Sequence, residues 1–133
     1  MPAASAARLL AVRYPVQMPI ETKHLESGPV VVTVSGRLVL GKDAERLETT
    51  VNDLLQKNQK RLVLDLTSLE YADSSGIGTF VSCISAARKA GGEVSMAGVN
   101  PRIQRLFQIT GINHLMSLYP TVAEAAAAAA SRG

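Results

Sequence analysis

Short aliphatic runs alternate with helical patterns along this chain, and this alternation constrains the fold more than any other feature. Val30–Val34 is β-branched throughout, and Leu62–Leu64 is a second continuous apolar run. Between the two runs, apolar residues recur at helical spacing over Asp43–Gln56. Such runs are typical of buried strands, and their alternation with helices favours right-handed crossovers and a mainly parallel sheet. The pattern therefore predicts an α/β domain.

The remaining patterns predict a mixed sheet of four to five strands with about four α-helices packed on it, the sheet being mixed because the chain opens with a hairpin. Turn and cap signals set the limits of each element. We expect strands over Ile20–Glu26, Val30–Ser35, Arg37–Leu40, Arg61–Leu66, Glu93–Ala97 and His114–Leu118. We expect helices over Asp43–Gln56, Ser75–Ala90, Pro101 to Gly111 and, after a capping box at Thr121–Glu124, Ala125–Ala130. Thr67–Ala72 is expected to be a link without regular structure.

A length of 133 residues fits one domain. We expect residues 18–131 to form it and residues 1–17 to be a poorly ordered extension, with a leader or a non-native start left open as alternatives. The Leu9–Val12 segment is too short for a secretory signal, and no apolar run reaches the roughly 18 residues of a membrane span. We therefore expect a cytoplasmic protein without a membrane span.

The charges and the metal-ligating residues point to no nucleic acid, metal or cofactor. The net charge is +3, but the basic residues are scattered and aromatic residues make up only 4% of the chain. Direct nucleic-acid binding would require a clustered basic stripe. Cys83 is the only cysteine, and His24 and His114 lie far apart in the chain, so no metal-ligand spacing is present.

A phosphate-binding loop is suggested by Gly36-Arg-Leu-Val-Leu-Gly41-Lys42, which has the spacing G-x-x-x-x-G-K. The motif then needs a Ser or Thr hydroxyl to bind the metal, and Asp43 stands there instead. A carboxylate at that point would repel phosphate, and the residues between the glycines resemble a strand. Nucleotide hydrolysis is therefore disfavoured.

The strongest candidate site is Asp73-Ser74-Ser75-Gly76, which opens the predicted helix after an apolar strand. Asp and Ser are preferred helix caps, so the motif alone also fits a helix without a function. Its position favours a function, because ligands of open α/β sheets bind beyond the carboxyl ends of strands. A serine there is presented to solvent, and a phosphate on it would meet the positive end of the helix. A serine hydrolase would need a base and an oriented triad, which this sequence does not offer.

At these residues the chain resembles the STAS domain family, and within it the bacterial anti-sigma factor antagonists. The resemblance runs from about Val30 to Ala128. It is carried by Leu62-Val-Leu-Asp-Leu66, Leu69-Glu-Tyr-Ala-Asp-Ser-Ser-Gly-Ile-Gly78, Ala90-Gly-Gly-Glu93, Val99-Asn-Pro-Arg-Ile-Gln-Arg-Leu-Phe107 and Thr110-Gly-Ile112.

The resemblance implies a non-enzymatic switch without a cofactor. An unphosphorylated antagonist binds an anti-sigma factor serine kinase and frees a sigma factor; phosphorylation of the serine after the aspartate, here Ser74, ends the binding, and a serine phosphatase resets it. The alternative is a STAS scaffold or transporter accessory subunit without a link to a sigma factor. The expected partner-binding residues are Asp73, Ser74, Ser75, Gly76, Ile77, Gly78, Arg37 and Lys42.

One stretch departs from the family pattern. Where the family commonly has Gly-Glu-Leu-Asp after the early strand, this chain has Gly36-Arg37-Leu38-Val39. Two acidic positions have become basic and apolar. Because those acids often lie near the kinase contact surface in the family, the departure concerns the partner more than the assignment of Ser74.

Overall fold

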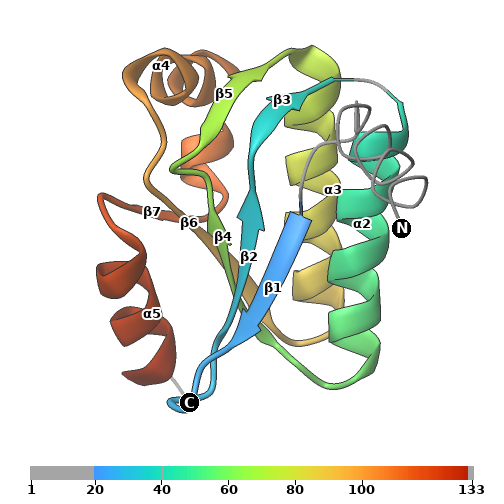
Figure 1. The fold of residues 1–133 in the computed structure, drawn as a ribbon, viewed down its shortest axis with the longest axis vertical. Helices are drawn as coiled ribbons and strands as arrows, with labels where there is room; N and C mark the ends of the chain where they lie inside the picture. The colour runs from blue at the N-terminus through green and yellow to red at the C-terminus, as the bar shows by residue number, and fades with distance from the viewer. Residues whose placement is uncertain (1–19, 40, 132–133) are drawn as a thin grey trace, which may run out of the picture.

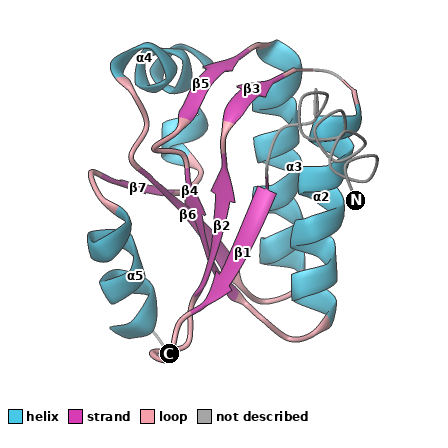
Figure 2. Cartoon of the chain, viewed as in Figure 1, coloured by secondary structure: helices cyan, strands magenta, loops and turns pink. Residues whose placement is uncertain are grey.

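The computed structural model describes residues 20–39 and 41–131, which form seven strands and four α-helices. The order of elements follows the predicted alternation, with one added strand (Figures 1 and 2). The elements are β1 (Ile20–His24), β2 (Val30–Val34), β3 (Gly36–Leu38), α2 (Lys42–Gln56), β4 (Arg61–Asp65), β5 (Leu69–Ala72), α3 (Ser74–Lys89), β6 (Glu93–Ala97), α4 (Pro101–Thr110), the 3-10 turn η1 (Ile112–His114), β7 (Ser117–Tyr119) and α5 (Val122–Ser131).

The main sheet has five strands in the order β1-β2-β4-β6-β7. Strand β1 pairs antiparallel with β2, whereas the other three pairings are parallel. The mixed sheet predicted from the opening hairpin is therefore confirmed. The carboxyl ends of the parallel strands meet at one edge of the sheet, and β3 and β5 extend beyond that edge in Figure 1.

Strand β5 corrects the prediction that Thr67–Ala72 is a plain link. Leu69–Ala72 pairs in parallel with β3, and the two strands form a small second sheet. Leu69 and Ala72 are buried while Glu70 is exposed. The strand escapes a pattern search because it has four residues and pairs with only three, with a register shift between Gly36 and Arg37.

Helices cover both faces of the main sheet, and each face has its own apolar cluster. Figure 1 shows α2 and α3 side by side on one face, starting at the same end, with α5 on the other. Successive strand residues point to opposite faces. Val30, Val32 and Val34 accordingly pack towards α2 and α3, whereas Val31 packs in the smaller cluster under α5.

Several predicted boundaries move by a few residues. Helix α2 begins at Lys42, one residue before the predicted start at Asp43, and the Gly41 that precedes it makes no side-chain hydrogen bond. The segment predicted as a strand over His114–Leu118 begins as a 3-10 turn, so that β7 starts only at Ser117. The extension predicted over residues 1–17 lies outside the described residues.

Candidate functional site

Asp73 starts α3 as its N-terminal cap. Its backbone is extended, and its Oδ1 accepts a hydrogen bond of 3.0 Å from the amide of Gly76. The amide of Asp73 itself donates to the carbonyl of Leu38, 3.3 Å away on β3. A short polar side chain is required here because the first amides of a helix have no partner within the helix. The predicted cap is confirmed, and the helix starts at Ser74, one residue earlier than expected.

Gly76 lets the first turn of α3 press against β3. A Cβ atom at this position would lie 2.5 Å from the carbonyl oxygen of Leu38 and 3.3 Å from the Cβ of Ala72. Ile77 follows it into the core and is 6% exposed. Gly76 and Ile77, expected at the binding surface, are therefore buried beneath the turn, whereas Gly78 is exposed and nothing lies within 4 Å of where its Cβ would stand.

The two serines of the motif lie in different surroundings. Ser74 is exposed and is the first residue of α3. Ser75 is partly buried, and its carbonyl accepts a hydrogen bond of 3.2 Å from the hydroxyl of Thr79. A macromolecule approaching the turn meets the Ser74 side chain first.

A groove of about 410 Å³ runs between the Asp73–Ser74 turn and α4. One wall is the end of β5 and the start of α3, and the other is a single face of α4, because positions 102, 105, 106 and 109 lie on one side of a helix. Ile109 on this wall is 73% exposed. The lining residues are Tyr71, Ala72, Asp73, Ser74, Arg102, Ile103, Arg105, Leu106 and Ile109.

Sequence reasoning missed the α4 wall of this groove. Ile103 and Phe107 form the buried face of α4. The available signal was Ile109, an apolar residue that falls off that face and lies seven positions after Arg102. A second stripe on a short helix is a reason to look for a partner.

Of the two outlying residues expected at the site, the structure brings one close to the groove. The guanidinium carbon of Arg37 lies 4.3 Å from the ring centroid of Tyr71, which lines the groove. A cation over an aromatic face is attracted by the ring quadrupole. Lys42 is exposed at the first turn of α2, where it lines a separate shallow depression with Glu45 and Arg46.

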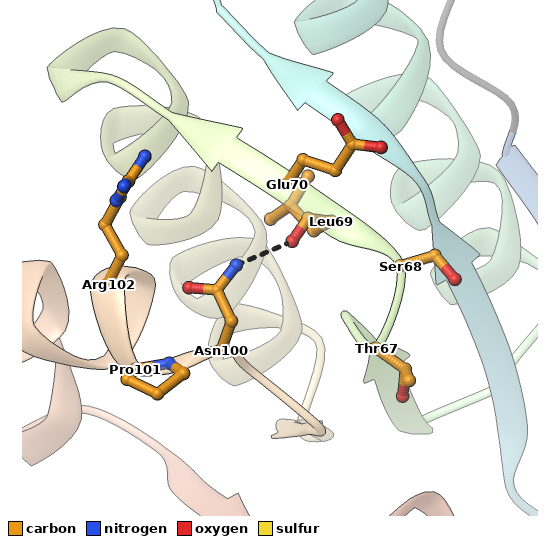
Figure 3. Close-up of a pocket in the computed structure, with 7 residues that line it drawn as sticks. All are labelled: Thr67, Ser68, Leu69, Glu70, Asn100, Pro101 and Arg102. Carbon is orange, nitrogen blue, oxygen red and sulfur yellow. Dashed lines mark hydrogen bonds between the residues drawn. The ribbon is translucent and has the colours of Figure 1, made fainter.

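A second hollow, of about 520 Å³, lies between the start of β5 and the start of α4. Figure 3 shows Asn100 reaching from the start of α4 to the carbonyl of Leu69, with Glu70 and Arg102 coming from opposite sides. The Asn100 amide nitrogen donates this bond at 3.2 Å, while its oxygen caps α4 by accepting from the Ile103 amide at 2.9 Å.

The residues that suggested a phosphate-binding loop have structural roles. Gly36 and Arg37 belong to β3, whose backbone pairs with β5, so they form no phosphate cradle. Asp65, at the end of β4, accepts hydrogen bonds from the amide and hydroxyl of Thr67 at 3.0 and 2.6 Å. Over residues 20–39 and 41–131, no group of three His, Cys, Asp or Glu side chains is placed to hold a metal ion.

Cys83 lies on the buried face of α3 and packs in the main core. Burial raises the pKa of the Cys83 thiol to about 12, with a smaller contribution from the negative charge of Glu48. The thiol therefore stays protonated near neutral pH, whereas a nucleophilic cysteine requires a thiolate.

None of the helices described is long and apolar enough to span a bilayer.

A comparison with protein families identifies the domain that carries this turn and groove. The model of the STAS domain matches residues 19–125, which include both walls of the groove. The chain belongs to the STAS domain family.

Curated relatives of this STAS domain are named as antagonists of anti-sigma factors. It is 29% identical over 105 residues to the anti-sigma F factor antagonist of Paenibacillus polymyxa, covering 78% of this chain and 88% of the relative. It is 36% identical over 70 residues to the anti-sigma-B factor antagonist of Staphylococcus aureus, covering 53% and 65% of the two chains. The two relatives are named for different sigma factors.

A solved structure shares both the fold and part of the sequence. The crystal structure of an anti-sigma factor antagonist from Mycobacterium paratuberculosis superposes on this STAS domain with a TM-score of 0.74. The two are 25% identical, and the match covers 86% of this chain and 96% of the other. The predicted architecture, a STAS-like mixed sheet with helices on it, is confirmed.

Proposed function

We propose that this STAS domain is an anti-sigma factor antagonist of a partner-switching system, and that Ser74 is its phosphorylation site. In the unphosphorylated state it binds an anti-sigma factor serine kinase and so frees a sigma factor; phosphorylated Ser74 ends the binding. The observation that carries the proposal is the placement of Ser74, exposed at the first turn of α3 beside the groove.

The chemistry of the turn supports a phosphorylation switch. The Ser74 hydroxyl oxygen attacks the γ-phosphorus of ATP bound to the kinase, ADP leaves, and the hydroxyl proton passes to a base of the kinase. The phosphate adds a charge of about −1.5 to −2 at the positive end of a 16-residue helix. The turn tolerates this charge in place, because Asp73 and Gly76 already hold the backbone. The switch therefore changes the surface without refolding the domain.

Exposure and hydrogen bonding favour Ser74 over Ser75 as the acceptor. Ser75 is partly buried, and its carbonyl accepts a hydrogen bond from the hydroxyl of Thr79. A kinase must bring the hydroxyl in line with the γ-phosphate, which an exposed first-turn residue permits without unwinding the helix. A serine phosphatase would need the same access to reset the switch.

The proposed role places the protein in the cytoplasm and gives it no chemistry of its own. Its partners are the kinase and the phosphatase, and it acts on transcription without touching nucleic acid. The binding surface comprises Asp73, Ser74, the partly buried Ser75 and Gly78, with Arg37 at the rim of the groove. Lys42, at the start of α2, extends the surface to a second helix.

Phosphorylation by the cognate anti-sigma factor kinase tests the assignment. We expect mass spectrometry of the purified chain to show one added phosphate after incubation with kinase and ATP, located on Ser74. Ser74→Ala should abolish the addition, and the matched control Ser75→Ala should retain it. Equal labelling of Ser74→Ala and the wild type would overturn the assignment of Ser74.

Capture of partners from native lysate separates this proposal from a STAS scaffold or transporter accessory subunit. An anti-sigma factor kinase bound to the wild type, and lost when Ser74 is phosphorylated, supports the switch. Recovery of membrane transporter subunits without such a kinase would favour the accessory subunit.

A further inference from the structure

The groove beside Ser74 combines exposed apolar surface with positive charge. Ile109 exposes 73% of its surface, and Leu106 beside it is only partly buried. Arg102 and Arg105 are exposed on the same wall, and within the described part of the chain neither guanidinium group forms a hydrogen bond or an ion pair. An exposed apolar side chain flanked by two free guanidinium groups is typical of a surface that binds a partner.

The acidic charge at the groove is already engaged. Asp73 is the one carboxylate among the described lining residues, and its Oδ1 caps α3. Arg37, held over Tyr71, adds a third cation near the rim. Glu70 faces the neighbouring hollow rather than this groove. The groove therefore presents an excess of positive charge to whatever enters it.

We propose that this groove binds an acidic, amphipathic segment of the anti-sigma factor partner. An apolar side chain of the segment packs on Leu106 and Ile109, and its carboxylates pair with Arg102 and Arg105. Arginine is suited to this role because its planar fork can hold a carboxylate through two parallel hydrogen bonds. The inference rests on the proposed function and specifies the chemistry of the partner surface.

The same geometry explains how phosphorylation releases the partner. Ser74 lines the groove opposite the two arginines. A phosphate there brings a charge of about −1.5 to −2 into the space that the partner's carboxylates would occupy. It competes for Arg102 and Arg105 and repels an acidic segment, so binding and phosphorylation exclude each other by charge.

Calorimetry with the cognate kinase tests the proposal on the full chain. We expect Arg102→Glu/Arg105→Glu to weaken kinase binding by about tenfold or more. The matched control is Lys57→Glu/Lys89→Glu, which reverses two exposed charges at the far ends of α2 and α3 and should leave the affinity within about twofold. Ile109→Ser, at an exposed position, should weaken binding while leaving the unfolding midpoint unchanged. Wild-type affinity in the Arg102→Glu/Arg105→Glu variant would overturn the inference while leaving the proposed function intact.

A second measurement separates the two proposals if the kinase does not bind. The probe is a synthetic helical peptide with leucines on one face and glutamates beside them, titrated into the chain and followed by amide chemical shifts. We expect shifts at residues 73–74 and 102–109 and much smaller ones with glutamine in place of glutamate. Shifts elsewhere, equal binding of both peptides, or groove shifts caused only by phosphatidylglycerol vesicles would overturn the inference.

Discussion

The carbonyl oxygen of Leu38 lies 2.5 Å from the point where a Cβ atom on Gly76 would stand. The same carbonyl accepts the hydrogen bond from the amide of Asp73. This single backbone carbonyl of β3 therefore contacts both the capping residue and the first turn of α3. The position of Ser74 depends on the Leu38 carbonyl, because Ser74 lies between Asp73 and Gly76, the two residues that contact this carbonyl.

Replacing Gly76 by alanine should force the turn away from β3. We expect Gly76→Ala to lower the free energy of unfolding by about 1–3 kcal/mol, because the added methyl meets backbone rather than a flexible side chain. Gly78→Ala is the matched control: nothing lies within 4 Å of its Cβ, and alanine should stabilise the helix by about 0.5–1 kcal/mol. Urea unfolding measures both, and effects of the same sign would contradict the model of the turn.

Removing the cap at Asp73 should destabilise α3 without disturbing the core. We expect Asp73→Ala to lower the free energy of unfolding by about 1 kcal/mol, because the amide of Gly76 loses its acceptor. Asp73→Asn keeps a capping oxygen and should retain most of the stability. If both variants lose the same amount, the charge of Asp73 rather than its hydrogen bond stabilises the turn.

Asn100 should stabilise the protein through both ends of its side chain. Asn100→Ser keeps an acceptor for the Ile103 amide but loses the donor to Leu69, which should cost about 0.5–1.5 kcal/mol. Asn100→Ala loses both and should cost about 1 kcal/mol more. Chemical unfolding of the two variants separates the two bonds, and equal losses would show that only the bond to Leu69 contributes.

The thiol of Cys83 should make stability fall in alkaline solution. The pKa of Cys83 is raised from 9.0 to about 12, so above pH 9 the unfolded chain loses the proton while the folded chain keeps it. The stabilisation is fully present below pH 9 and is lost as the pH rises towards 12, by up to about 1.4 kcal/mol per pH unit. Cys83→Ala lacks this dependence. Unfolding of both proteins across this range measures it, and a constant difference between them would contradict the expectation.

Elements with their own cap and period could be predicted from sequence, whereas those that depend on a distant partner could not. The apolar stripe of α2 and the helix that runs from Pro101 towards Gly111 follow from local rules and are confirmed. Strand β5 was missed because it forms only by pairing with β3, which lies some thirty residues earlier. The 3-10 turn before β7 has no period by which to recognise it.

The residues of the candidate site likewise differ in whether local sequence or contacts between distant segments place them. Asp73 and Ser74 are adjacent in sequence, and their cap chemistry is local, so the motif identified the turn. Arg102 and Ile109 line the groove from α4, whose start is bonded by Asn100 to the carbonyl of Leu69 on β5. Neither this bond nor the groove is visible in the local pattern, so the second wall required the structure.

The small side chains beneath α5 have a consequence for how the protein opens. On that face of the sheet, Val31, Val63 and Ala97 pack against Ala125 and Ala129 of α5. Because these side chains are small, little apolar area is buried between the helix and the sheet. Arg61 adds hydrogen bonds of 3.4 Å to the carbonyls of Ala129 and Ala130 at the end of the helix. The amides of α5 should therefore exchange with deuterium ahead of those in α2 and α3. Because α5 lies on the face opposite α2 and α3, its opening should leave the Asp73–Ser74 turn at the start of α3 in place (Figure 1).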